Sequence, residues 1–206
     1  PLLVDEAHRR DLGAEGASET GEDLAEHVVE AEVAREIFDA CLAGTATPQQ
    51  QREFAGHMLT EMARMSCNDG LVMTLHAGVF RNHNSKTFIA YGADTGHDIP
   101  VSVEFTQNLR PLLERYGLHE NLTLILFCLD ESAWSREIAP LAGFYPSVRI
   151  GAPWWFLDAP ESALRFRSAT TEIAGFYRGS GFIDDTRAFL SIPARHDMAR
   201  RVDSLY

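Results

Sequence analysis

The chain has 206 residues, a net charge of −12 at pH 7 and a hydrophobic content of 45%, which together predict one globular domain with a substantial core. The negative charge argues against nucleic acid as a partner, because phosphate binding requires a basic surface. No apolar run reaches the roughly 20 residues that cross a bilayer and the first residues lack the pattern of a signal peptide, so we expect no membrane contact and a cytoplasmic location.

The first third of the chain divides into an irregular segment and a pair of helices. Residues 1 to 22 are polar and rich in Gly and Glu, which is typical of a surface loop. Residues 23 to 69 predict a helical insertion: one helix over residues 23 to 42, then a second that Thr47 caps and that runs to about Cys67. Five apolar residues of the second helix are expected to lie on one face: Phe54, Met58, Leu59, Met62 and Met65.

Residues 70 to 206 alternate between short apolar runs and helical patterns. Such alternation favours βαβ units and a parallel sheet, hence an α/β fold. The expected strands cover residues 71 to 80, 122 to 130, 147 to 156 and 181 to 189. The expected helices cover residues 104 to 116, 132 to 142 and 160 to 178, with a last helix from about Arg195.

Polar and aromatic residues gather where these strands end. In parallel α/β architectures the loops after the carboxyl ends of the strands converge on one site. The sequence after the first strand contains no GxGxxG or GxxxxGK[ST] phosphate loop, so a barrel is favoured over a doubly wound sheet. The residues that we expect at this rim are His76, Asp130, Trp154, Trp155, Asp184 and Asp185.

His76 and Asp185 are the candidate metal ligands and acid–base groups. Imidazole nitrogen and carboxylate oxygen are the usual ligands of catalytic zinc or manganese. A carboxylate near a buried strand end is costly unless it is paired or bound to a metal. The alternatives are a hydrogen-bonded structural role for His76 and a helix cap or salt bridge for Asp185.

Two arginines and two tryptophans are candidates for substrate binding. Arg187 shares a strand face with Asp185 if the backbone is extended, and its planar fork suits a carboxylate. Arg81, in the loop after the first strand, could hold a carboxylate or hydroxyls. Trp154 and Trp155 could wall a sugar-sized pocket, although large aromatic residues more often serve packing, and Arg187 could simply neutralise a neighbouring aspartate.

The three cysteines predict no disulfide framework. Cys41, Cys67 and Cys128 are odd in number and form no CxxC pair. A cysteine zinc site is equally unsupported, so we expect all three to be small buried residues.

Four segments together resemble one enzyme family. The motifs "TLHAGVFRNHNSKTF", "GADTGHDIP", "GAPWWFLDAPE" and "GFIDDTRAFLSIPARHDMARR", in this order, closely resemble the uronate isomerases, also called glucuronate isomerases, of the amidohydrolase superfamily. The resemblance covers most of residues 70 to 203 and implies a distorted (β/α)8 barrel of which this chain carries strands five to eight. Residues 23 to 69 then correspond to the helical insertion before the fifth strand.

The resemblance also implies a reaction and roles for individual residues. The family interconverts D-glucuronate with D-fructuronate and D-galacturonate with D-tagaturonate, with the help of a divalent metal, most plausibly zinc. Asp185 resembles the metal-binding aspartate of the eighth strand and His76 the histidine of the fifth. Arg187 resembles the substrate-binding arginine, and the aromatic wall of the sugar site is Trp155 in preference to Trp154.

The family's pattern is incomplete in this chain. The H-x-H metal pair of the first barrel strand is absent from the sequence, which leaves two alternatives open: a non-catalytic remnant of the family, or a metal-dependent hydrolase of the same superfamily. Four strands cannot close an eight-stranded barrel, and open sheet edges favour association. We therefore expect a homo-oligomer.

Overall fold

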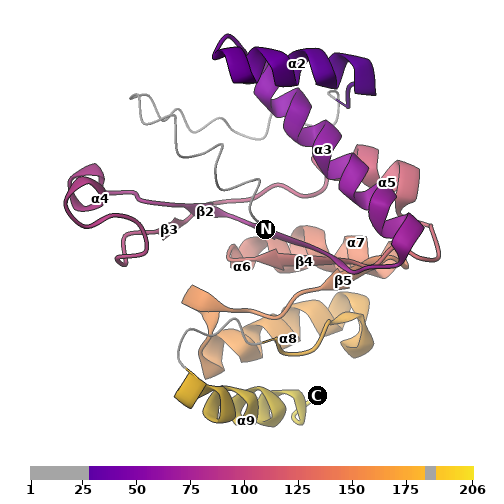
Figure 1. Cartoon of the computed structure of the whole chain (residues 1–206). Helices are drawn as coiled ribbons and strands as arrows, with labels where there is room; N and C mark the ends of the chain where they lie inside the picture. The colour runs from indigo at the N-terminus through magenta and orange to yellow at the C-terminus, as the bar shows by residue number, and fades with distance from the viewer. Residues whose placement is uncertain (1–27, 184–188) are drawn as a thin grey trace.

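The computed structural model describes residues 28–183 and 189–206. It begins with two helices, α2 (Ala31–Ala43) and α3 (Pro48–Asp69), which lie beside each other at one end of the molecule (Figure 1). The predicted cap is confirmed. Thr47 accepts the Gln50 N–H at 3.2 Å, and the Gln50 side chain accepts the Thr47 N–H at 2.9 Å, so two amides at the helix start are satisfied.

The predicted apolar face of the second helix is buried only in part, at Phe54 and Leu59. Met58, Met62 and Met65 are exposed, and the residues that α3 buries are smaller: Thr60, Ala63, Ser66 and Cys67. Small residues allow α3 to pack closely on its neighbours, and the flexible methionines lie on its outer side. Cys67 and Cys128 are buried as expected, whereas Cys41 is exposed on α2.

A three-stranded parallel sheet forms the centre of the chain. The strands are β1 (Met73–Ala77), β4 (Leu124–Cys128) and β5 (Val148–Ile150), in the order β1-β4-β5. The predicted α/β class is therefore confirmed. In the register of the first pair, His76 lies opposite Phe127, which places both side chains on the same face of the sheet.

The two faces of this sheet are buried to different degrees. Leu124, Leu126 and Val148 are fully buried in the core, together with residues of the helices that follow the strands. On the other face Thr74 and His76 are exposed, and Arg149 is half-buried. Phe127, also on this second face, is buried near the carboxyl end, so apolar cover on this face is concentrated at the rim.

Two of the helices after the strands are shorter than the patterns predict. The pattern over residues 104 to 116 becomes a helix only from Arg110, and the one over residues 160 to 178 ends at Gly175, whose φ is 86°. The pattern over residues 132 to 142 contains a π-helical turn, η2. The elements are α5 (Arg110–Tyr116), α6 (Glu131–Ala133), η2 (Trp134–Ile138), α7 (Ala139–Phe144), η3 (Trp155–Leu157), α8 (Pro160–Ala174), η4 (Phe176–Arg178), η5 (Phe189–Ser191) and α9 (Ile192–Asp203).

A small lobe follows β1 that the sequence did not predict. The expected strand over residues 71 to 80 breaks at Gly78, whose φ of 98° suits only glycine. Beyond it β2 (Val79–Phe80) pairs antiparallel with β3 (Ile99–Pro100), and α4 (Ser85–Tyr91) lies between them. This lobe extends away from the helices α2 and α3 (Figure 1).

The fourth predicted strand is described only at its start. Gly179 forms a parallel bridge with Ile150, and the Ser180 N–H donates to the Ile150 carbonyl at 2.8 Å. The chain therefore reaches the β5 edge before the predicted start at residue 181. Residues 184–188 lie outside the described residues. Within the described part, no helix is long and apolar enough to cross a membrane.

Candidate functional site

Three aromatic rings meet at the carboxyl ends of the parallel strands. The imidazole of His76 stacks on Phe127, with ring centroids 4.3 Å apart, and meets Trp154 edge-on at 5.2 Å. Gly151, directly after β5, makes this possible, because a Cβ there would lie 2.5 Å from the Phe127 ring. His76 therefore has its ring plane fixed by packing on two sides while its residue remains exposed.

Arg81 and Trp155 form the second part of the rim. The Arg81 guanidinium lies 5.4 Å from the centre of the Trp155 ring, a cation–π distance. Trp155 is 42% exposed and has a φ of 55°, which is a strained conformation for a bulky residue. A strained and exposed tryptophan beside an arginine is more consistent with a ligand-facing role than with core packing.

Two carboxylates of the lobe hold Arg81 in place. Its Nη1 donates to Asp94 at 3.2 Å and to Asp98 at 3.4 Å. Asp98 is only 5% exposed and also accepts the Asn82 backbone N–H at 2.8 Å. Because Asp98 binds both the backbone and the side chain of this turn, it orients Arg81. The motif "GADTGHDIP" contains both aspartates, but the sequence offered no signal of this pairing.

The two tryptophans connect these parts into one site. Trp154 contacts His76 and the adjacent Trp155 contacts Arg81, so four of the predicted site residues come together at the rim. Trp154 is buried and Trp155 is partly exposed. Asp185 and Arg187, with Asp184, lie outside the described residues, and their roles stay predictions.

The segment that begins at residue 189 is fixed to the loop after β5. Arg195 forms an ion pair with Asp158, and the ring of His196 meets Phe182 edge-on at 4.9 Å. A small cavity opens next to these residues, between α8 and α9, and its lining includes Phe166, Phe182 and Met198. Its lining contains none of His76, Arg81, Trp154 and Trp155.

The described residues do not form a complete metal site. Among residues 28–183 and 189–206, no three His, Cys, Asp or Glu side chains are grouped so that they could hold an ion. His76 supplies one imidazole to the rim. Cys128, at the end of β4, is an unsuitable nucleophile, because burial raises the pKa of its thiol to about 11.

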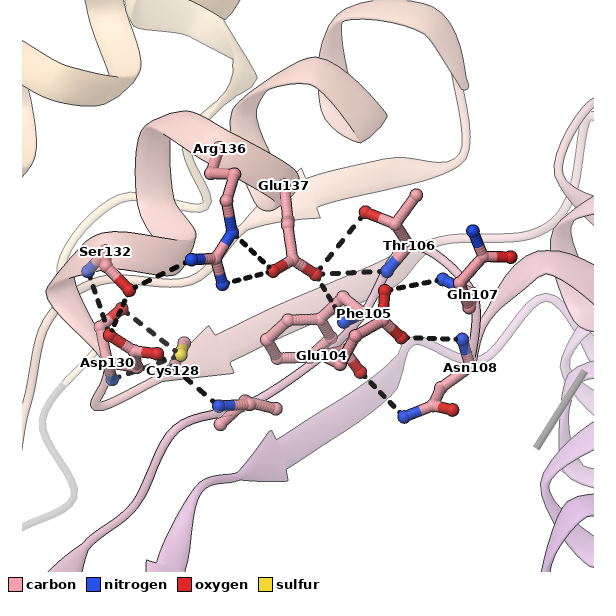
Figure 2. A network of polar contacts seen from close by, with 11 residues as sticks. Glu104, Phe105, Thr106, Gln107, Asn108, Cys128, Asp130, Ser132, Arg136 and Glu137 are labelled. Atoms are coloured by element: carbon pink, nitrogen blue, oxygen red, sulfur yellow. Dashed lines mark hydrogen bonds and ion pairs between the residues drawn. The ribbon is translucent and has the colours of Figure 1, made fainter. Parts of the chain in front are cut away.

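A network of carboxylates lies behind the rim (Figure 2). Asp130 follows β4 and accepts the backbone N–H of Ser132 at 2.9 Å, which caps α6. Glu137, in η2, is only 5% exposed and binds Arg136 through two bonds of 2.9 and 2.5 Å. The sequence placed Asp130 at the rim without a role, and Glu137 was missed because it reads as one more charge on an amphipathic helix.

Known proteins match nearly the whole chain. The model of the glucuronate isomerase family matches residues 10–205. The chain belongs to this family. It is 58% identical over 173 residues to the uronate isomerase of Xanthomonas oryzae pv. oryzae, and 50% identical over 200 residues to that of Cutibacterium acnes. These matches cover 84% and 97% of this chain but 37% and 42% of the two relatives, so the chain spans about two fifths of their length.

Solved structures agree with this assignment. The glucuronate isomerase from Caulobacter crescentus superposes with a TM-score of 0.84 at 52% identity, covering 88% of this chain and 38% of that chain. The uronate isomerase from Thermotoga maritima gives a TM-score of 0.79 at 27% identity, with 84% and 38% covered. The predicted family is therefore confirmed, and the predicted amidohydrolase-type barrel class is supported. The assignment of strands five to eight stays a prediction.

Proposed function

We propose that the chain forms part of an isomerase that interconverts hexuronates: D-glucuronate with D-fructuronate, and D-galacturonate with D-tagaturonate. The observation that supports this most is the meeting of His76, Trp154, Trp155 and Arg81 at the carboxyl rim of the parallel sheet in a member of the glucuronate isomerase family. A sugar acid offers the three features that this rim suits: an anionic group, hydroxyls and an apolar ring face.

Arg81 and Trp155 are the proposed substrate-binding residues of the described part. Both ion pairs of Arg81 use Nη1, so the Nε–Nη2 edge of the fork is the edge that we assign to the substrate carboxylate. The exposed face of Trp155 would carry the apolar side of the sugar, and buried Trp154 would support it from below. Arg187 is assigned a second contact with the carboxylate.

His76 and Asp185 are the proposed catalytic residues. The isomerisation removes the proton from C2 of the open-chain aldose and adds a proton to O1, which gives an enediol. A proton is then returned to C1 and the O2 proton is lost, so that the C1 aldehyde becomes an alcohol and C2 becomes the ketone. An imidazole can take or give such a proton near neutral pH, and the stack on Phe127 fixes the ring of His76 for the transfer. Asp185 would move the proton that opens the sugar ring.

A divalent metal, most plausibly zinc, is the proposed cofactor, with Asp185 and His76 as its candidate ligands; His76 would serve either as a ligand or as the acid–base group. Such an ion supplies Lewis-acid polarisation of the sugar oxygens. The described residues bring only the imidazole of His76 to this position, and no step above depends on the ion.

The proposal also includes the place of this chain in the barrel, its cellular location and its association. Residues 70 to 206 would represent strands five to eight of the barrel, and residues 23 to 69 the insertion before them. Residues 1 to 22 lie outside the described residues. The open face of the sheet, with Thr74 and Arg149, would face the barrel interior. We further propose a cytoplasmic location. We also propose self-association, because β1 forms an edge of the described sheet.

Ligand binding by the arginine gives the test. Titration of the chain with D-glucuronate should quench the tryptophan fluorescence in a saturable way. In Arg81→Met the dissociation constant for D-glucuronate should rise at least about tenfold, because a charge-assisted contact with the carboxylate is lost. Arg110→Met is the matched control, since Arg110 lies on α5 and pairs with Glu114 on the surface. Equal binding by both variants, or none by the native chain, would contradict the proposal.

A further inference from the structure

Three backbone N–H groups between β3 and α5 donate to carboxylate side chains. Residues 101–105 have no regular secondary structure, so their N–H groups need other acceptors. The Phe105 and Thr106 N–H groups donate to Oε2 of Glu137 at 2.5 and 3.1 Å, and the Val103 N–H donates to Oδ2 of Asp130 at 3.4 Å. Two side chains from the region after β4 thus accept the backbone hydrogen bonds that a neighbouring strand would accept in a sheet (Figure 2).

Two side chains of α6 and η2, Ser132 and Arg136, link the two carboxylates to each other. The Ser132 hydroxyl donates to Asp130 at 2.7 Å, and Arg136 reaches both Ser132, at 3.5 Å, and Glu137. Burial raises the pKa of Glu137, but the Phe105 N–H, Arg136 and the Thr106 N–H together bring it below its ordinary value. Glu137 is therefore a charged acceptor at neutral pH, which strengthens its bonds to the backbone.

The anchored segment holds the loop that carries the site residues. The Val101 N–H donates to the carbonyl of Gly78 at 3.0 Å. The Val103 side chain covers Gly78 so closely that a Cβ on that glycine would lie 2.5 Å from it. Gly78 lies two residues after His76 and three before Arg81, so its position determines the course of the chain between these two side chains.

We propose that Glu137, assisted by Asp130, is a positioning residue for the hexuronate site. It fixes the segment over residues 101 to 106, which in turn fixes Gly78 and hence the relative placement of His76 and Arg81. This inference rests on the proposed function for its kinetic consequence. Its structural consequence is a change in the contact between Arg81 and the Trp155 ring, since Arg81 lies on the same loop. This change can be measured without turnover.

Glu137→Gln gives the test, with Glu114→Gln as its matched control. The glutamine is isosteric, but its amide would face the Arg136 donors or the Phe105 N–H, so one of these contacts is lost. Glu114 is an exposed carboxylate on α5 paired with Arg110. In Glu137→Gln, amide exchange at Phe105, Thr106 and Val101, whose N–H donates to the Gly78 carbonyl, should quicken at least about tenfold, and the NMR signal of the Trp155 indole N–H should shift. Glu114→Gln should change neither.

Substrate kinetics distinguish the two roles of Glu137, because a residue that only anchors residues 101 to 106 would leave KM and kcat unchanged. The KM for D-glucuronate should rise about tenfold with a smaller change in kcat, because Arg81 is a binding residue. Val103→Ala, which leaves the buried carboxylate paired, should reproduce the Trp155 shift if Glu137→Gln fails to fold. If the native chain shows no turnover, the proposed function fails, while the exchange and indole measurements still decide the positioning role.

Three outcomes would overturn the inference. Faster exchange at Phe105 and Thr106 with an unchanged Trp155 signal would make Glu137 a local anchor only. Equal effects of Glu137→Gln and Glu114→Gln would show a general response to lost charge. An unchanged Trp155 signal in Val103→Ala would break the link through Gly78.

Discussion

The two faces of the parallel sheet belong to the same strands, but one face contributes mainly to stability and the other carries the site residues. Leu126 of β4 is fully buried on the helix-covered face, and its neighbour in register, Leu75, points the same way. On the opposite face His76 and Thr74 are exposed. Apolar burial on the first face supplies most of the stability, whereas the second face carries the groups that can do chemistry.

This difference has a consequence for how substitutions should act. A residue of the covered face should affect the free energy of unfolding and leave local site chemistry alone when the fold survives. A residue of the open face should show the reverse. The carboxylate network and the Phe127 ring lie between these extremes, because they are buried and also position the rim.

The largest expected effect comes from the covered face. Leu126→Ala should lower the free energy of unfolding by about 2–5 kcal/mol, since it leaves a cavity in a fully buried position. Urea denaturation followed by circular dichroism measures this directly. Thr74→Ala, two strand positions before His76 on the open face, should change stability by less than about 0.5 kcal/mol. Similar losses for both variants would show that the two faces are equivalent in burial.

The next effect concerns Glu137 and its dependence on pH. Its folded-state pKa is lowered, so the unfolded chain binds more protons at mildly acidic pH. The stabilisation is therefore complete above the unfolded value near 4.5 and is lost as pH falls through the folded value. Glu137→Gln should cost about 1.5–3 kcal/mol at pH 7, the range for a hydrogen bond to a charged group.

Denaturation at a series of pH values checks this sign. The difference between the native chain and Glu137→Gln should shrink steadily below pH 4.5. A difference that stays constant down to pH 3, or that grows as the solution becomes more acidic, would contradict the charged state assigned to Glu137.

A smaller loss of stability is expected for a substitution at Gly151, and the control substitution at Gly143 should increase stability. Gly151→Ala should cost about 1–3 kcal/mol, because the new Cβ would collide with the Phe127 ring. The displaced ring should also disturb His76. Gly143→Ala, in α7 with no atom near the added Cβ, should instead stabilise by about 0.5–1 kcal/mol. Thermal unfolding of both variants checks the comparison, and a neutral Gly151→Ala would argue against the close stack.

Much of the covered face could be predicted from the sequence, and little of the rim. The apolar run of β4 and the Thr47 cap of α3 are local patterns, and both were predicted. The lobe with α4 was missed because its elements are short and its boundaries depend on Gly78. The exposed methionines of α3 show that helical spacing alone does not tell which apolar stripe is buried.

The site could be predicted by residue type but not by contact. His76, Arg81 and the two tryptophans were singled out, since they follow predicted strands. Their pairing depends on contacts between distant segments, such as Asp98 with Arg81 and Phe127 with His76, which no local pattern encodes. The strained φ of Trp155 is likewise a product of the folded loop.

Turnover followed by NMR tests the central claim most directly. D-glucuronate is incubated with the chain and zinc, and the signals of the aldose and of D-fructuronate are integrated over time. The account predicts that the ketose accumulates at the expense of the aldose and that His76→Gln, which keeps the size but not the acid–base chemistry, reduces the rate at least about a hundredfold. A folded chain that binds D-glucuronate but forms no fructuronate would contradict the account and favour the alternative of a non-catalytic fragment or remnant of the family.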